Sequence, residues 1–511
     1  MVADGRADDF AAHGCPYSIE KLIDHKGLRG YFAQTSTVKI IQHARPPGGI
    51  VRTSSRMLAD RLIAEIDAVL NRQVNAILHH PDFQAMEARW LGLDLLVREA
   101  GRSAEVKIKL ISASWKELAR SMERATDFDQ SHLFELVYNR EFGMPGGEPF
   151  GLLVGDYDLS PAAIDGADTV STLARLSTVA AAAFCPFIAG ASPQAIGLET
   201  FRELNRVSDF SWLQQDKTRL RWNSLRGNDD TRFLGLVAPR VLMRPPHKPF
   251  WRKRNDGFPF REHLAETGET LLWGNSAFAF AAIILRTFID SGWFADMRGV
   301  TQDEIDGGML APWQLPGLDI GVESEGLSAQ PPVEVKLTRS QELQLSDLGI
   351  VPVATTYLSS SAIFNANQSL HAPGHYSSET ARQNARLAAM LQYVLCASRF
   401  SHYLKVIMRD NIGQLSTANV IQRRLEDWLS GYTLGNDDAD VSLRSRYPLR
   451  SAGIHVTEIP GKPGAFSCTV RLQPHFQLDD ISTSFHLVAE TSGAAAMGAS
   501  AGQTEPKRIV A

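Results

Sequence analysis

Apolar residues recur at three- and four-residue steps in two neighbouring stretches, which predicts two amphipathic helices. The first helix carries its apolar side chains at Leu58, Leu62, Ile66, Val69, Val74 and Ile77. Pro81 ends it, because proline cannot continue a helix. The second helix covers residues 83–99, and its apolar stripe is formed by Met86, Trp90, Leu93 and Val97.

Further along, apolar runs of strand length alternate with helical patterns. Residues 105–111 alternate polar and apolar side chains, which predicts a half-buried strand. Residues 150–154 are continuously apolar and lie between turn-forming clusters at 143–147 and 155–158, which predicts a buried strand with a sharp loop at each end. The later expected elements are a helix near 168–183, a strand at 187–189, a strand at 232–242 and an apolar helix at 276–291. This alternation indicates an α/β core of mixed sheets with packed helices.

The pattern changes after residue 378. Helices are expected at 379–405 and 419–432, and residues 454–458 and 466–472 then alternate on either side of a Pro/Gly-rich loop, which predicts a β-hairpin. A third short strand is expected at 485–489. The resulting domains are an extended arm at 1–55 with an isolated strand at 37–41, an α/β core at 56–378, a helix-and-hairpin domain at 379–490, and a tail at 491–511. The small and polar residues of the tail predict disorder.

Composition excludes several classes of protein. The 511 residues include 52 Lys and Arg against 57 Asp and Glu, a net charge of −5, which gives no support to general nucleic-acid binding. The four cysteines, Cys15, Cys185, Cys396 and Cys468, show no Cys-x-x-Cys spacing, so zinc and disulfide frameworks have no basis. The most apolar stretch, residues 277–285, is far shorter than the ~20 residues of a membrane span, and no signal segment is visible. We therefore expect a soluble cytoplasmic protein.

Four carboxylates near the predicted strand at 150–154 form the best candidate for chemistry: Glu141, Glu148, Asp156 and Asp158. Asp156 and Asp158 share one side of an extended chain and could offer oxygen ligands to Mg²⁺ or Ca²⁺. The simpler interpretation is that Asp156 forms a turn and that Glu148 caps or pairs at the loop.

Other candidate sites are weaker. His79 and His80 could ligate a metal, but neighbouring helical residues diverge, which favours capping of the helix end. Arg219, Arg221, Trp222 and Arg226 could form a nucleic-acid platform, although a solvated loop or a protein contact fits so small a set better. Phosphate-binding, dinucleotide-binding and zinc-protease motifs are absent, and a Gly-x-Ser-x-Gly string at 498–502 lies in the tail without a strand or helix around it. We predict no catalytic residue, metal or cofactor.

A series of short strings resembles one family, the large subunit of the type VI secretion contractile sheath (TssC/VipB/ImpC). The strings are Ile66-Asp67, Gln73-Val74, residues 77–84, Glu87, Trp90, Gly92-Leu93, Phe142-Gly143, residues 146–151 with Gly146, Gly147, Glu148, Pro149 and Gly151, Pro239-Arg240, Leu272-Trp273-Gly274-Asn275, residues 403–406, Ile412-Gly413, residues 447–450, and Arg471 with residues 474–476. They follow the family's order from about residue 56 to 490. Residues 1–50 match poorly, and Met144-Pro145 replaces the usual residues before Gly146.

The resemblance implies a structural function. Such proteins pair with a small sheath subunit, stack into a helical tube around an inner tube, and contract to drive that tube from the cell. It further implies contacts with copies of the same chain, the inner-tube protein, baseplate components and an AAA+ recycling ATPase, without nucleic acid or membrane insertion. It implies that strands of neighbouring subunits complete shared sheets, which selects Val38, Ile40, Ile454, Val456, Phe466, Cys468, Val470 and Leu472 as pairing residues.

Under this interpretation the glycine-rich segment is structural. Gly146, Gly147 and Gly151 would let the backbone turn tightly into the buried strand, and Gly155-Asp156 would turn it out again. Two alternatives stay open at this stage. One is a metal-dependent hydrolase that uses Glu148, Asp156 and Asp158, and the other is an adaptor that binds another protein without forming tubes.

Overall fold

The computed structural model describes residues 55–475, except 145, 217–218, 248–257, 259, 266–267, 269, 295–296, 300–306, 319–330, 356–360, 375, 411–416, 437–440 and 460–465, together with the strand at 485–491. The chain divides into two compact units. The first comprises Met1–His80 and His247–Ala265, and the second comprises Pro81–Pro246 and Glu266–Ala511. Across the described residues, no helix is long and apolar enough to cross a membrane.

Helix α4 (Ser55–Leu78) of the first unit confirms the first predicted helix. The predicted apolar stripe of α4 is only partly buried within the described chain. Ile66 and Ile77 are exposed, Leu62, Val69 and Val74 are half-buried, and the only buried side chain among those described in α4 is that of Asn75. The period of a helix identifies an apolar face, but it does not say whether the same chain covers that face.

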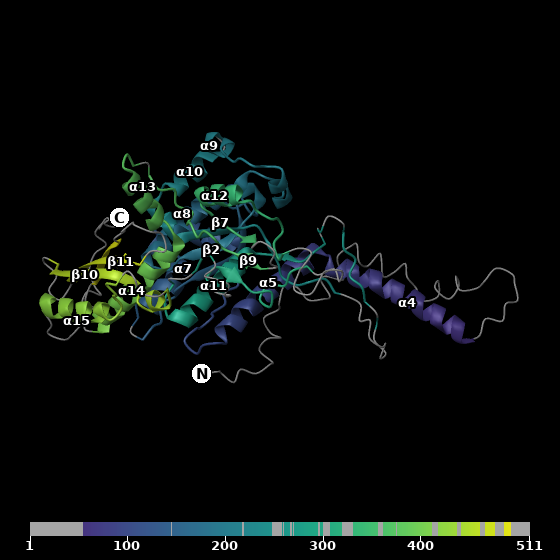
Figure 1. Ribbon diagram of the computed structural model, residues 1–511, viewed down its shortest axis with the longest axis horizontal. Helices are drawn as coiled ribbons and strands as arrows, with labels where there is room; N and C mark the ends of the chain where they lie inside the picture. Colours follow the sequence, from purple (N-terminus) through teal and green to yellow (C-terminus); the bar gives the residue numbers. More distant parts are fainter. Residues whose placement is uncertain are drawn as a thin grey trace. The chain divides into compact units, whose positions relative to one another are not determined.

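A four-stranded parallel sheet forms the centre of the second unit (Figure 1). Its order is β1 (Leu153–Leu159), β2 (Phe187–Ala191), β3 (Leu234–Ala238) and β7 (Ile350–Pro352). One apolar core joins Phe187 and Leu236 to α8 (Thr169–Ala182), α10 (Leu220–Arg226) and α12 (Arg339–Asp347). A second core joins Ile188 and Val237 to α5 (Pro81–Ala100) and α11 (Ser276–Ser291). The sheet is therefore covered on both faces, as a parallel sheet requires.

Helix α11 is buried on most sides because it lies between the sheet and α5. The face that α5 turns toward it consists of Ala88, Gly92, Leu95, Leu96 and Ala100. The predicted stripe of α5 lies on another face, where Met86 and Leu93 are half-buried and Trp90 and Val97 are exposed. Small residues on the opposite face let the two helices approach closely, which buries α11 better than a stripe of large side chains would.

Strand β1 begins at Leu153 and runs to Leu159, so the predicted strand at 150–154 is displaced toward the C-terminus. The prediction that Gly155-Asp156 forms a turn is also wrong. Both residues lie inside the strand, which has a register irregularity between Gly155 and Asp158. A Cβ atom on Gly155 would lie 2.5 Å from Cζ of Phe187, so packing against β2 rather than a turn requires glycine at this position.

Residues 105–111 do not pair as a strand within the described chain, although alternation predicts one. Two small antiparallel sheets complete the core: β4 (Val241–Leu242) with β5 (Trp273–Gly274), and β6 (Met309–Leu310), β9 (Ala362–Ile363) and β8 (Ala354–Thr355). The shorter helices are α6 (Trp115–Arg124), η1 (Phe128–Gln130), α7 (His132–Phe134), the π-helix η2 (Glu135–Phe142), η3 (Pro193–Ile196), η4 (Phe201–Asn205), α9 (Trp212–Gln215) and η6 (Asp229–Phe233).

The C-terminal region confirms the predicted helices and hairpin. Its helices are α13 (Glu379–Ala388), α14 (Leu391–Asp410), α15 (Ala418–Ser430) and α16 (Val441–Arg446). Strand β10 (Leu449–Glu458) pairs antiparallel with β11 (Phe466–Pro474), and β12 (Phe485–Thr491) pairs with the other side of β11. Helix α15 lies beside this sheet (Figure 1), and a third apolar core fills the space between them with Phe400, Leu425, Ile454 and Val470. Mixed α/β architecture is thus confirmed.

Candidate assembly surfaces

The four carboxylates of the candidate metal site each have a separate cationic partner. Glu141 pairs with Lys109, and Glu148 pairs with Lys107. Asp156 pairs with Arg89 at 2.5 Å, and Asp158 pairs with Arg240 at 3.5 Å. The hydrogen bond from Lys109 holds the pKa of Glu141 below its usual range. In the part of the chain that the structure describes, no group of His, Cys, Asp and Glu side chains could hold a metal ion. This geometry gives no support to a metal-dependent hydrolase.

The glycine-rich loop at 143–151 is tight at one point in particular. A Cβ atom on Gly147 would lie 2.1 Å from the backbone oxygen of Glu141, so the chain crosses itself too closely for any other residue. Gly146 has a φ of 79°, which also favours glycine. The backbone N–H of Glu148 then donates to Oε2 of Glu141 at 3.1 Å. Gly151, by contrast, has open space around it, and Pro149 is half-buried.

The motif Trp273-Gly274-Asn275 joins α11 to the sheet. The side chain of Asn275 caps α11 by accepting from the backbone N–H of Ala277 at 2.9 Å, and its amide donates to the backbone oxygen of Tyr157 on β1 at 3.3 Å. Gly190 on β2 makes room for it, since a Cβ there would lie 2.7 Å from Oδ1 of Asn275. Gly274 gives similar room to Met243. These residues fix the position of α11 over the sheet.

Unlike Trp273, Gly274 and Asn275, Trp90 lies on the surface. Its side chain is 64% exposed on the outer face of α5. An exposed tryptophan contributes little to packing within one chain, and such residues are enriched where another protein binds.

The basic and aromatic residues at 219–226 form neither a platform nor a solvated loop. Arg219, Trp222 and Arg226 are buried, and the last two lie in α10. The guanidinium of Arg226 donates to the backbone oxygens of Leu370 at 3.0 Å and Asp347 at 2.7 Å, and burial lowers its pKa to about 10. These residues tie connecting segments together, which their spacing in the sequence did not reveal.

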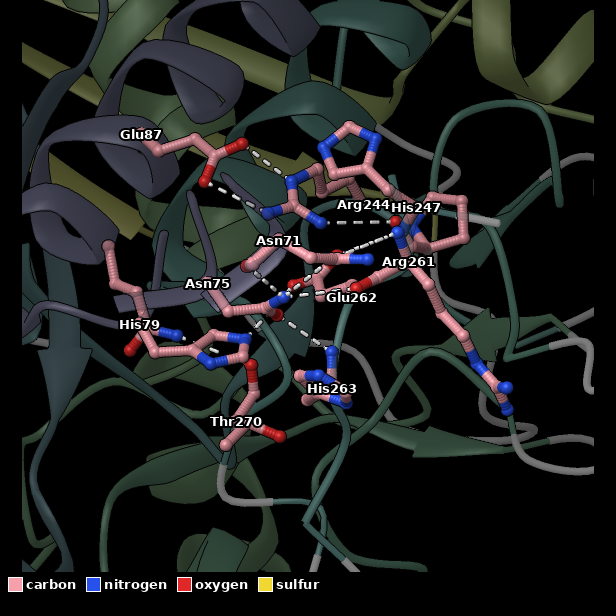
Figure 2. A network of polar contacts seen from close by, with 12 residues as sticks. Asn71, Asn75, His79, Glu87, Arg244, His247, Arg261, Glu262, His263 and Thr270 are labelled. Atoms are coloured by element: carbon pink, nitrogen blue, oxygen red, sulfur yellow. Dashed lines mark hydrogen bonds and ion pairs between the residues drawn. The ribbon is translucent and has the colours of Figure 1, made fainter. Parts of the chain in front are cut away.

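Two polar networks are drawn in Figure 2. In the first unit, Asn75 donates to the backbone oxygen of Arg261 at 3.0 Å and accepts from the backbone N–H of His263 at 2.7 Å. His79 lies 3.4 Å from the buried carboxylate of Glu262, so it pairs with a distant residue and does not cap α4 as expected. In the second unit, Arg244 pairs with Glu87. The first network fastens the segment around residue 262 to α4.

A buried cationic and aromatic cluster connects α14 with the π-helix η2. Nζ of Lys405 lies 4.4 Å from the ring centre of Tyr138 and 3.9 Å from that of Phe142, and burial lowers its pKa to about 8. One turn earlier, Nε2 of His402 donates to the backbone oxygen of Ala183 at 2.9 Å. Burial lowers the pKa of His402 to about 4, so the imidazole is neutral at pH 7.

The C-terminal sheet contains most of the residues inferred to pair with neighbouring subunits. Ile454, Val456, Cys468, Val470 and Leu472 bury their side chains against α14 and α15, and Phe466 packs partly buried beside them. The backbone of β11 is already paired on both sides by β10 and β12. Only the outer strands of this sheet could therefore pair with a strand of another chain. The inferred pairing residues on β11 are not available for it: Phe466, Cys468, Val470 and Leu472.

The outer edge of β10 has two contacts among the described residues. Thr433 forms an isolated bridge with Leu449 at the start of the strand, and Oε1 of Gln422 accepts from the backbone N–H of Val456 at 3.2 Å. Ile454 lies between these two points. Val38 and Ile40, the other inferred pairing residues, lie outside the described residues.

Comparisons with known proteins agree with the sequence resemblance. Residues 60–371 match the family described as EvpB/VC_A0108, tail sheath N-terminal domain, and residues 380–491 match the EvpB/VC_A0108 tail sheath gpW/gp25-like domain. The chain is 33% identical over 470 residues to the type VI secretion system sheath protein TssC1 of Pseudomonas aeruginosa, an alignment that covers 90% of this chain and 91% of the relative. The chain therefore belongs to the TssC/VipB family and is a structural subunit of the type VI secretion sheath.

Proposed function

We propose that this sheath subunit acts without catalysis. It pairs with a small sheath subunit, polymerises with further copies of itself around an inner tube, and contracts as an assembly to expel that tube. The observation that carries this proposal is the exposed apolar stripe of α4. Ile63, Ile66, Leu70 and Ile77 are all exposed and lie along one line of the helix.

The spacing of this stripe favours a helical partner. Steps of three, four and seven residues place the side chains in one narrow line, the arrangement that packs against a second amphipathic helix. Ile66 is 46% exposed and Leu70 is 40% exposed. A contiguous apolar surface of this kind is unfavourable in water and is typical of an interface. We assign this stripe to the small sheath subunit.

We further propose that the N-terminal arm, residues 1–55, links neighbouring copies. Its isolated strand at 37–41, with Val38 and Ile40, would add to the outer edge of β10 beside Ile454 and Val456. Main-chain hydrogen bonds at an open sheet edge give affinity, and alternate side chains set the register. In this proposal the core at 56–378 and the C-terminal domain at 379–490 carry the two kinds of contact.

The remaining partners follow from the assembly. The inner-tube protein occupies the lumen, baseplate components start polymerisation, and an AAA+ ATPase recycles the contracted form in the bacterial cytoplasm. No reaction at this chain is needed for contraction, because an assembly with two arrangements can store free energy in one and release it in the other.

Co-expression with a small sheath subunit from the same bacterium tests the proposal. Negative-stain electron microscopy is expected to show long tubules, and the chain expressed alone is expected to aggregate. Leu70→Asp should abolish the complex, because it puts a charge into the apolar stripe. Ala68→Asp on the opposite, exposed face of α4 is the matched control and should leave tubules intact. A one-to-one complex that never polymerises would identify an adaptor instead.

A further inference from the structure

Residues 106–112 form an extended, strand-prone segment. They lie in no helix, turn, bend or paired strand. The backbone N–H and C=O groups of the segment have no hydrogen-bond partner within the described chain. Three of its apolar side chains are exposed: Leu110 at 69%, Ile111 at 55% and Ile108 at 37%. Apolar side chains and free backbone groups are thus presented together.

The segment is held in place by its polar side chains. Lys107 pairs with Glu148 and Lys109 pairs with Glu141, and Nζ of Lys109 lies 5.2 Å from the ring centre of Phe150. Residues two apart that reach the same loop indicate an extended backbone, in which Ile108 and Leu110 share the other side. At the C-terminal end, the hydroxyl of Tyr157 donates to the backbone oxygen of Ala113 at 2.7 Å. The backbone of the segment is therefore fixed and yet unpaired.

Such an element is a template for strand addition. The alternating sequence gave the prediction of a paired strand, and the chain itself supplies no partner for it among the described residues. We propose that residues 106–112 accept a β-strand of the small sheath subunit, which would form main-chain hydrogen bonds with this segment and cover Ile108 and Leu110. This inference rests on the proposed pairing with that subunit.

Two observations describe the partner that fits this segment. The segment follows a few residues after α5, whose outer face exposes Trp90 and Val97. One continuous stretch of chain therefore presents apolar groups outward, as expected for a single partner. Because Lys107 and Lys109 stay partly exposed, a donor strand with apolar residues on one face and carboxylates on the other fits best.

Hydrogen–deuterium exchange provides the direct test. The amides of residues 106–112 are followed in the full-length chain alone, kept soluble at low concentration, and in the assembled complex with the small sheath subunit. About every second amide is expected to exchange at least ~100-fold more slowly in the complex, since a new strand covers one edge only. Tubules in which these amides exchange as fast as in the free chain would overturn the inference while leaving the proposed function intact. Failure to form any complex would instead count against the proposed function.

Proline substitutions give an independent readout. Leu110→Pro and Ile111→Pro each remove one backbone N–H, and adjacent N–H groups of a strand point to opposite edges. One variant should lose at least tenfold in affinity for the small subunit and the other should not, whereas Ile111→Thr, which keeps the N–H and lies on the side opposite Ile108 and Leu110, should bind nearly normally. Equal binding by both proline variants would contradict strand addition.

A double variant of the arm distinguishes the two possible donors of the strand, which are the small subunit and the arm of this chain. The full-length chain with Val38→Pro and Ile40→Pro cannot donate its own strand at 37–41. Protection of residues 106–112 should persist in its heterodimer with the small subunit. If protection disappears, the donor is the arm of this chain, and the assignment to the small subunit is wrong.

Discussion

The ring of Phe278 on α11 occupies the space beside Gly92 on α5 that a side chain would fill: a Cβ atom built on Gly92 would lie 2.5 Å from its Cδ2. Both residues belong to the core that covers one face of the parallel sheet. The close approach of α5 and α11 therefore depends on the absence of one methyl group.

Gly92→Ala is expected to destabilise the folded chain by ~1–3 kcal/mol, because overpacking a closely packed core costs about that much. The measurement is the free energy of unfolding from denaturant titration. Gly151→Ala serves as control, since no atom lies within 4 Å of the added Cβ there. An unchanged midpoint for Gly92→Ala would show that Phe278 moves aside at little cost.

Asn275→Ala should cost ~1–3 kcal/mol, since it removes both the cap of α11 and the hydrogen bond to Tyr157 on β1. Asn275→Asp keeps the capping oxygen and loses only the amide donor, so its loss of stability is expected to be smaller. Thermal unfolding of the three proteins side by side measures both contributions. Equal destabilisation by the two variants would show that the bond to Tyr157, and not the cap, carries the effect.

His402 is expected to make stability depend on pH in the acidic range. Its pKa is about 4 in the folded chain because of burial, with Arg399 and Lys405 acting in the same direction, against an ordinary value of 6.5. The unfolded chain therefore binds a proton first as pH falls below about 6.5, and the folded state loses stability until about pH 4. Between pH 7.5 and 5 the loss should be ~1–2 kcal/mol.

His402→Gln isolates this contribution, because glutamine keeps a donor for the backbone oxygen of Ala183 and does not titrate. Unfolding free energies at pH 7.5 and 5 are compared for both proteins. The variant should lose less stability than the parent chain on acidification. If both lose the same amount, other groups are responsible.

Removing residues 1–45 is expected to leave pairing with the small sheath subunit but to prevent extended or contractile tubules, since the arm is proposed to link neighbouring copies. Size-exclusion chromatography reports the heterodimer, and electron microscopy reports the tubules. Normal contraction by the truncated protein would refute the role of the arm.

Part of the fold was readable from sequence because local patterns decide it. The hairpin of β10 and β11 follows from alternation on both sides of a Pro/Gly-rich loop, and α11 follows from its long apolar run. Family order identified the protein class even where single strings were short. In each case neighbouring residues carry the information.

The errors have a common physical origin, which is contact between residues far apart in the chain. The buried face of α5 was not identified because small residues such as Ala88 and Gly92 give no hydrophobic signal in the sequence, although their small size lets α11 approach. Gly155-Asp156 has the composition of a turn, yet both residues lie in β1, where Gly155 pairs with Ala189 of β2. Glu262, the partner of His79, lies 183 positions away. The sequence also did not show which partner covers each assembly surface. Hydrophobic periodicity identifies an apolar face of a helix, but it does not identify what packs against that face.

The central position of β11 has a mechanical consequence. Strand β10 is joined to it along a continuous register from Ser451 opposite Gln473 to Glu458 opposite Phe466, and β12 is joined along its other side. A pull directed along β10 therefore loads many backbone bonds in shear at the same time, whereas peeling would break them one by one. A force applied to β10 is transmitted through β11 to the helices packed behind the sheet. The C-terminal sheet can therefore bear load between subunits.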